Sequence, residues 1–202
     1  MPRILDKIRE LRLRYGPLVR LLERSSSFRK LLEDRPILMP LLKSLKPAPL
    51  SAEEFIQDFQ REVTNVKSGT QVVIYSPYLS EKGIENYVGV LRSAAKKGVE
   101  IIIHTLTPEH WSIREKSKHA TLIKKLKKDI KAEIIERKNM HEKAVIITGE
   151  NIKVAYFGSL NVLSKYEGKA DYMLKFTHPE VVDALHLFLE TLALESEKPK
   201  EE

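Results

Sequence analysis

Cysteine is absent from the 202 residues, which excludes disulfides, thiolate zinc sites and cysteine nucleophiles. No apolar run approaches the roughly 20 residues of a membrane-spanning helix, and the N-terminus lacks the uninterrupted apolar stretch of a secretory signal. Glycine is scarce, with eight residues, and no glycine-rich phosphate loop is present. The six histidines show no compact metal-ligand spacing. We therefore expect a cytoplasmic protein that needs no metal or other cofactor and has no membrane partner.

Positive charge is unevenly distributed along a chain whose net charge is +7. Residues 1–50 hold 12 Lys and Arg against 5 Asp and Glu, and residues 92–131 hold 11 against 4. Two basic segments favour a polyanionic partner, and nucleic acid is the commonest one. The second segment supplies the candidate nucleic-acid-binding residues, which are Lys116, Lys118, Lys124, Lys125, Lys127 and Lys128. The alternative interpretation is a helix face that only meets solvent.

The order of patterns along the chain predicts two parts. Residues 1–50 form a basic helical arm that ends in a proline-rich linker, and residues 51–202 form an α/β domain with an acidic C-terminal tail. In that domain, helices are expected over 51–67, 81–97, 110–128 (one helix or a pair) and 179–194. Strands are expected over 71–76, 99–105, 130–136, 143–148, 152–158 and 171–176. This alternation predicts a mixed β-sheet with helices on both faces.

Two pairs of polar residues stand beside neighbouring strands. His141 and Lys143 are two residues apart at the start of one strand, and Ser159 and Asn161 repeat that spacing just after the next strand. Residues two apart on a strand face the same side. The tight turn between the strands makes them antiparallel, so all four side chains should converge on one edge of the sheet.

This convergence suits the chemistry of phosphate esters. An imidazole can be a nucleophile or a general acid near neutral pH, and a lysine stabilises a charged phosphoryl group. Serine and asparagine add neutral hydrogen-bond donors. Asp171, at the start of the following strand, could orient an imidazole. The alternative is a histidine in a polar turn with no role in catalysis.

The same residues resemble a known family. His141-Glu-Lys143-Ala-Val-Ile-Ile-Thr148, followed by Gly158-Ser159-Leu-Asn161, is similar to the phospholipase D superfamily motif, His-x-Lys-x(4)-Asp followed by Gly-Ser-x-Asn. The closest likeness is to its nuclease-like branch, whose domains occur alone or attached to DNA helicases and restriction enzymes. Thr148 departs from the pattern at the aspartate position of this HKD motif, an aspartate usually considered structural.

The resemblance implies roles for the residues that match. His141 would form a phosphohistidine or protonate the leaving oxygen, and Lys143 and Asn161 would hold phosphate oxygens with help from Ser159. Asp171 corresponds to an acidic position thought to support a histidine. Family members need two such motifs, whereas this chain holds one, so the resemblance implies a homodimer with a shared site.

Three hypotheses follow from these observations. The first is a metal-independent nuclease, a phosphodiesterase of the hydrolase class acting on DNA or RNA, with DNA favoured and a helicase or another DNA-processing enzyme as a further partner. The second is a catalytically silent dimeric module that only binds nucleic acid. The third, a lipid-directed phosphodiesterase, lacks an evident lipid-contacting stretch. Trp111, the only tryptophan, is interpreted as a packing residue, and Tyr78 as a candidate residue at the border of the site.

Overall fold

One mixed sheet organises the computed structural model, which describes residues 49–109, 111–165 and 171–197. Its seven strands in the described residues are β1 (Pro49–Ser51), β2 (Gln71–Tyr75), β3 (Glu100–Leu106), β4 (Glu133–Arg137), β5 (Ala144–Gly149), β6 (Ile152–Gly158) and β7 (Tyr172–Phe176). They lie side by side in the order β1-β7-β6-β5-β2-β3-β4. β2, β3 and β4 are parallel to one another, whereas the pairs formed by β5, β6, β7 and β1 are antiparallel. The predicted mixed α/β fold is therefore confirmed.

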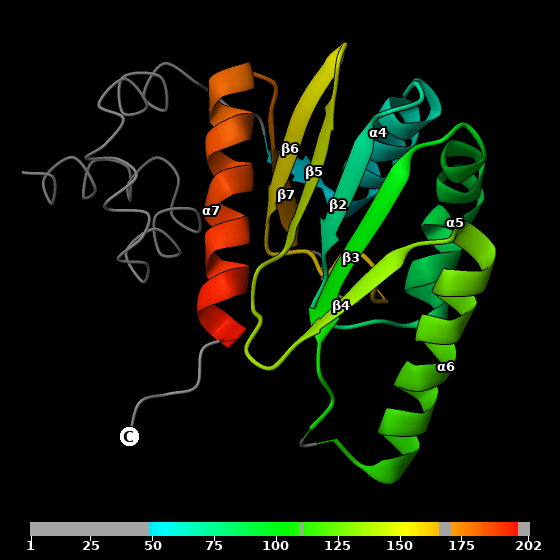
Figure 1. The fold of residues 1–202 in the computed structure, drawn as a ribbon. Helices are drawn as coiled ribbons and strands as arrows, with labels where there is room; N and C mark the ends of the chain where they lie inside the picture. The colour runs from blue at the N-terminus through cyan, green and yellow to red at the C-terminus, as the bar shows by residue number, and fades with distance from the viewer. Residues whose placement is uncertain (1–48, 110, 166–170, 198–202) are drawn as a thin grey trace, which may run out of the picture.

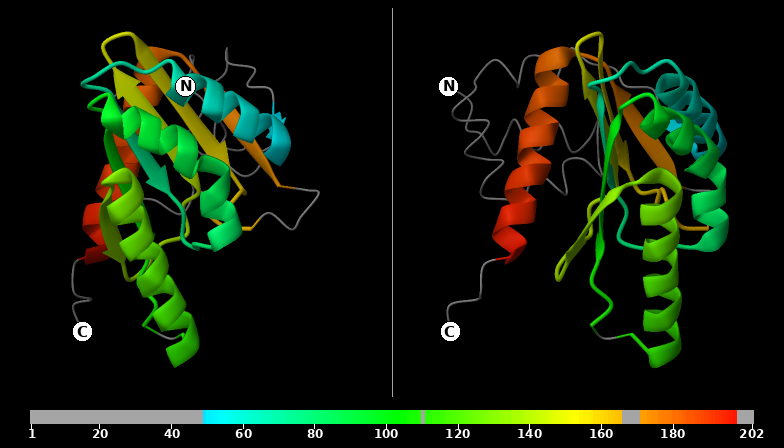
Figure 2. Two further views of the ribbon diagram at one scale, coloured as in Figure 1. Left: turned by 90° about the vertical axis from the view of Figure 1, so that its right-hand side faces the viewer. Right: turned by 45° about the vertical axis from the view of Figure 1, so that its right-hand side comes forward.

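Helices cover both faces of the sheet, as predicted, but unequally. In the described residues they are α4 (Ala52–Thr64), α5 (Glu81–Lys96), α6 (Ile113–Ile130) and α7 (Pro179–Glu197). Of these described helices, α4, α5 and α6 lie on one face, and α7 lies on the other (Figure 1, Figure 2). Each face has its own apolar core, and the core under α7 includes Phe157, Phe176 and Phe188. Successive side chains of a strand point to opposite faces, and apolar side chains occupy both faces here. Helices therefore pack on both faces and bury them.

Serines fix where three of the helices begin. Ser51 and Ser112 each form a capping box with the glutamate three residues on, and Ser80 caps α5 by accepting from the Gly83 backbone N–H at 3.1 Å. Such caps satisfy N–H groups that have no partner within the helix. At the other end of α6, Lys131 adopts a left-handed conformation (φ 53°) and stops the helix.

The predicted elements of the domain are present with shifts of a few residues at their ends. The segment expected over 110–128 is one helix rather than a pair, and it runs on to Ile130. β4 therefore begins at Glu133 and not at residue 130. β1 was not predicted: Pro49 pairs with Leu174 of β7, so the sheet begins before residue 51. The helices predicted within 1–33, the linker up to residue 48 and the tail from 198 onward lie outside the described residues.

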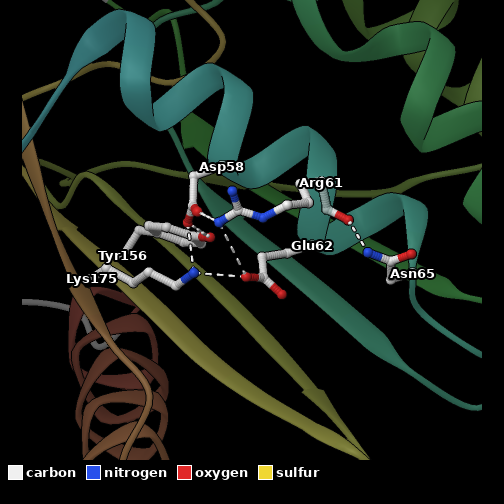
Figure 3. A network of polar contacts seen from close by, with 6 residues as sticks. All are labelled: Asp58, Arg61, Glu62, Asn65, Tyr156 and Lys175. Atoms are coloured by element: carbon white, nitrogen blue, oxygen red, sulfur yellow. Dashed lines mark hydrogen bonds and ion pairs between the residues drawn. The ribbon is translucent and has the colours of Figure 1, made fainter.

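A buried polar network joins α4 to the sheet (Figure 3). Asp58, 8% exposed, accepts from the Tyr156 hydroxyl at 2.7 Å and pairs with Lys175 Nζ at 2.7 Å. Lys175 Nζ also lies 2.7 Å from Glu62 Oε1, and Arg61 pairs with Asp58. Two cations thus match two carboxylates. Because the charges balance and the buried groups are partnered, we interpret this network as structural.

Candidate active site

The strand register places the predicted residues at one edge of the sheet. Ala144, the first residue of β5, lies opposite Tyr75, the last residue of β2, and opposite Phe157, near the end of β6. Gly158, which ends β6, lies opposite Met173 at the start of β7. The segments that precede β5 and β7 and those that follow β2 and β6 therefore meet there. These segments carry His141, Lys143, Ser159, Asn161 and Asp171.

Ser159 and Asp171 contact each other directly. The Ser159 hydroxyl donates to Asp171 Oδ1 at 2.9 Å and accepts from the Tyr172 backbone N–H at 3.2 Å. The Ser159 N–H in turn donates to the Tyr172 carbonyl at 3.0 Å. Gly158 makes this pairing possible, since a Cβ there would lie 2.1 Å from the Tyr172 carbonyl oxygen. Asp171, expected from the sequence to orient an imidazole, thus holds the serine hydroxyl in this structure.

Lys143 brings a partly desolvated cation to the same edge. Its side chain is half-buried, and its Nζ donates to the His141 carbonyl at 2.8 Å. Burial lowers the pKa of Lys143, while the negative charges of Glu142 and Asp171 act in the opposite direction. An ammonium group that has lost part of its hydration gains from contact with an anion such as a phosphate.

His141 has an exposed side chain, and its backbone N–H is held by a hydrogen bond. Its N–H donates to Glu142 Oε2 at 3.1 Å, and this carboxylate lies 3.5 Å from Nη1 of Arg137. Arg137 is 2% exposed, and its Nη2 donates to the Leu192 carbonyl of α7 at 2.8 Å. A chain of polar contacts therefore runs from α7 through two charged side chains to the nucleophile candidate.

Asn161 lies in the segment 159–164, which packs against the start of α5. Its Oδ1 is buried and has no hydrogen-bond partner among the described residues. The segment is held by two bonds: the Leu163 N–H donates to Ser76 Oγ at 3.0 Å, and the Ser80 N–H donates to the Leu163 carbonyl at 2.9 Å. Gly83 allows this approach, because a Cβ there would lie 2.5 Å from the Leu163 carbonyl group.

Thr148, the departure from the family motif, lies at the opposite end of β5. It pairs with Gln71 at the start of β2 and with Lys153 near the turn between β5 and β6. It lies five positions along the chain from Lys143, a span of roughly 17 Å on a strand. Replacement of the motif aspartate therefore changes no group at the candidate edge.

The lysines proposed to bind nucleic acid lie along α6. Those with exposed side chains are Lys116, Lys118, Lys124, Lys127 and Lys128. Lys125 is half-buried, and its Nζ lies 3.5 Å from Glu81 of α5. The N-terminal half of α6 extends beyond the sheet at the edge where β2 and β3 end, which is also the candidate edge (Figure 1, Figure 2). Lys116 and Lys118 belong to that half.

Three residues around the site were missed by sequence reasoning. Arg137 and Glu142 read as ordinary charged residues at a strand end and in a turn, and Leu192, to which Arg137 bonds, is remote in sequence. Gly83 reads as a weak point in a helix, although in the structure it admits the Leu163 backbone. The glycine inside a helical sequence pattern was the only signal that could have indicated this close approach.

Within the described residues, no three histidine or acidic side chains are grouped as metal ligands. None of the described helices has the length and apolar character needed to cross a membrane.

Comparison with known proteins gives a family for this sequence and relatives with a similar fold. The family model described as cardiolipin synthase, PLD-like domain, matches residues 64–192. NucT from Helicobacter pylori has a TM-score of 0.52 and 14% identity, with 75% of this chain and 96% of that protein covered. Polyphosphate kinase from Porphyromonas gingivalis has a TM-score of 0.56 and 13% identity, with 85% of this chain and 29% of that protein covered. Phosphatidylserine synthase from Haemophilus influenzae has a TM-score of 0.52 and 16% identity, with 73% of this chain and 36% of that protein covered. No curated protein matches the sequence.

These similarities have different weights. The chain spans nearly all of NucT but only about a third of the kinase and of the synthase, and at such low identity the structures indicate a shared fold alone. The family match covers more than half of the chain, including the segments that carry His141, Lys143, Ser159 and Asn161. The chain therefore belongs to the phospholipase D-like domain family.

Proposed function

We propose that this domain is a metal-independent phosphodiesterase that cleaves DNA or RNA through a phosphohistidine intermediate, in an active site completed by a second copy of the chain. The observation that carries the proposal is the register of β5, β6 and β7, which brings the segments that carry His141, Lys143, Ser159 and Asn161 to one edge of the sheet. The likeness of the motif to the nuclease-like branch of the superfamily and the lysines of α6 support the choice of a nucleic-acid substrate.

The reaction follows from the groups at this edge. A ring nitrogen of His141 attacks the phosphorus atom, a P–N bond forms, and the P–O bond to the leaving oxygen breaks. The imidazole of the second copy donates a proton to that oxygen. Water then attacks the phosphohistidine, the second imidazole takes its proton, and the P–N bond breaks to release the phosphate product and restore His141.

Lys143 and Asn161 bind the phosphate oxygens during both steps. The ammonium group stabilises negative charge on the phosphoryl group, and the asparagine amide donates a hydrogen bond to it. Asp171 accepts a hydrogen bond from the Ser159 hydroxyl, and the Tyr172 N–H donates one to the same oxygen, so the direction of the Ser159 side chain is fixed. Asp171 is a positioning residue in this scheme.

The first test measures cleavage of labelled single-stranded and duplex DNA and RNA in excess EDTA. We expect the wild type to cleave, and His141→Ala to lose at least about a thousandfold in rate because the nucleophile is absent. His186→Gln on α7 is the matched control and should cleave normally. Cleavage that needs added metal or survives in His141→Ala would refute the proposal. Salt-sensitive binding without turnover would instead identify a binding module.

A mixing experiment tests the shared site. Wild type and His141→Ala are co-expressed at equal levels with different tags so that subunits pair at random. If one site needs both imidazoles, only wild-type pairs are active and about a quarter of the activity remains, whereas independent sites retain about half. A remainder of one half, or a monomer that cleaves at full rate, would contradict the dimeric site.

A further inference from the structure

A second feature lies beside the candidate active site: an open groove of about 630 Å³ between the segment that follows β2 and the N-terminal half of α6. Tyr78 and Leu79 line one side, and Trp111, Lys118, His119 and Leu122 line the other. Its volume suits a ligand the size of one or two nucleotides, since small-molecule pockets typically measure about 300–1,000 Å³. Nothing in the proposed phosphoryl chemistry uses these residues.

Aromatic rings from the two sides of the groove contact each other. The ring of Tyr78 lies nearly parallel to that of Trp111, with 6.0 Å between centroids and 20° between planes. Trp111 in turn meets the ring of His119 edge-on at 5.2 Å. Tyr78 is 44% exposed, although a large aromatic side chain gains from burial. An exposed ring that lies roughly parallel to a second, partly exposed ring beside a groove offers a surface on which a flat ligand can stack.

His119 gives the groove a polar group in need of a partner. The side chain is 3% exposed, and neither of its ring nitrogens has a hydrogen-bond partner among the described residues. Its Nε2 lies 3.3 Å from Glu136 Oε1, which favours the proton on Nε2 and leaves Nδ1 as an acceptor. Burial lowers the pKa of His119 and so favours the neutral ring, although Glu136 opposes this shift. An N–H group of a ligand would satisfy that acceptor.

Hydrogen bonds join one side of the groove to the candidate edge. Ser76 Oγ donates to the Tyr78 carbonyl at 3.0 Å and accepts from the Leu163 N–H at 3.0 Å. The Ser80 N–H donates to the Leu163 carbonyl at 2.9 Å. The segment that carries Tyr78 is thus bonded directly to the segment that carries Asn161, and Lys118 adds positive charge at the rim of the groove.

We propose that this groove binds an unpaired nucleobase of the substrate, stacked on Tyr78 and Trp111, so that the protein selects single-stranded or locally unpaired nucleic acid. This inference rests on the proposed function for its substrate class. A base within a duplex is paired and stacked on its neighbours and cannot enter the groove without unpairing. A flat base with N–H donors matches the parallel rings and the His119 acceptor, whereas an acyl chain would leave that acceptor unpaired. In this proposal Trp111, which packs against Tyr78 and His119, also contacts the substrate.

The test uses Trp111, the only tryptophan in the chain, as its own reporter. Full-length protein with His141→Ala, which cannot cleave, is titrated with a 12-nucleotide single strand, the same strand without bases, and the duplex. We expect the single strand to quench the tryptophan fluorescence and to bind at least about tenfold more tightly than the abasic strand, because stacking contributes roughly 1–3 kcal/mol per base. The duplex should quench little.

Variants distinguish base stacking in the groove from electrostatic binding of the phosphate backbone. Tyr78→Ala should lose about tenfold or more in affinity for the single strand and little for the abasic strand, while Tyr78→Phe keeps the ring and the affinity. Ile113→Ala is the matched control, since this side chain is 89% exposed and does not line the groove. Equal binding of the normal and abasic strands, or of single strand and duplex, would overturn the proposal. Phospholipid vesicles that quench Trp111 more strongly than DNA would also overturn it. Because binding is measured without cleavage, the result is separate from the test of catalysis.

Discussion

Disruption of the ion pair between Arg137 and Glu142 is expected to destabilise the domain strongly. Their charged atoms are 3.5 Å apart, with side chains only 1% and 12% exposed. At an effective dielectric constant of about 20, two unit charges at that distance attract by roughly 5 kcal/mol before desolvation is subtracted. Removal of one partner leaves the other charge buried, and such changes cost about 3–5 kcal/mol. Arg137→Met should fall in this range, because it also leaves the Leu192 carbonyl without its 2.8 Å bond.

A double-mutant cycle isolates the pair from the other contacts of Arg137. Urea unfolding gives the free energies for Arg137→Met, Glu142→Gln and the double variant. We expect the double variant to be less destabilised than the sum of the single variants by at least about 2 kcal/mol, because neither charge is then left alone. Amide hydrogen exchange at His141 should accelerate in Arg137→Met, since Glu142 accepts its N–H.

The exposed pair Lys153–Asp183 provides the control for this cycle. Its atoms are closer, at 2.6 Å, but both side chains are solvated, at 38% and 46% exposed. Solvent screening limits such pairs to about 1 kcal/mol or less. If the buried pair coupled no more strongly than this one, burial would not determine its strength and the reasoning would be refuted.

Two other predictions concern the groups around the site. Burial lowers the pKa of His104 from 6.5 to about 4, so the native state resists protonation. The contribution of the neutral His104 ring to the free energy of unfolding is therefore complete above pH 6.5. It falls by about 3 kcal/mol as the pH drops from 6.5 to 4, because the unfolded state binds the proton first. His104→Phe should remove this part of the pH dependence in urea unfolding at pH 7 and pH 4; an unchanged slope would contradict the shift. Gly158→Ala should lower the unfolding free energy by about 1–3 kcal/mol or more, because the new Cβ would lie 2.1 Å from the Tyr172 carbonyl oxygen, which belongs to the backbone and cannot move aside. In the control Gly89→Ala, where nothing lies within 4 Å of the new Cβ, stability should not decrease.

Much of the sheet could be predicted because its strands are dense in β-branched residues. β3 and β5 each contain consecutive isoleucines and lie in the interior of the sheet, so composition and burial agree. β1 escaped prediction because its three residues include Pro49 and show no pattern. Proline fits there because β1 is an edge strand.

The candidate site divides in the same way between local and remote contacts. The i, i+2 spacing of His141 and Lys143, and the turn that joins β5 to β6, are local features that indicate a common edge. The partner of Arg137 lies 55 residues away, and Tyr78 meets Trp111 only because the parallel strands β2 and β3 end side by side. Such contacts depend on topology, which spacing in one sequence does not encode.

The strand order has a consequence for folding. β2 lies between β3, the next strand in sequence, and β5, from which α5, β3, α6 and β4 separate it along the chain. The first and last strands of the described residues, β1 and β7, also pair with each other, so completion of the sheet places Pro49 beside Leu174. Long-range pairings of this kind slow folding, because the chain loses loop entropy before the contacts form. During synthesis, the edge that carries the catalytic candidates would stay incomplete until the strand after Asp171 has emerged from the ribosome.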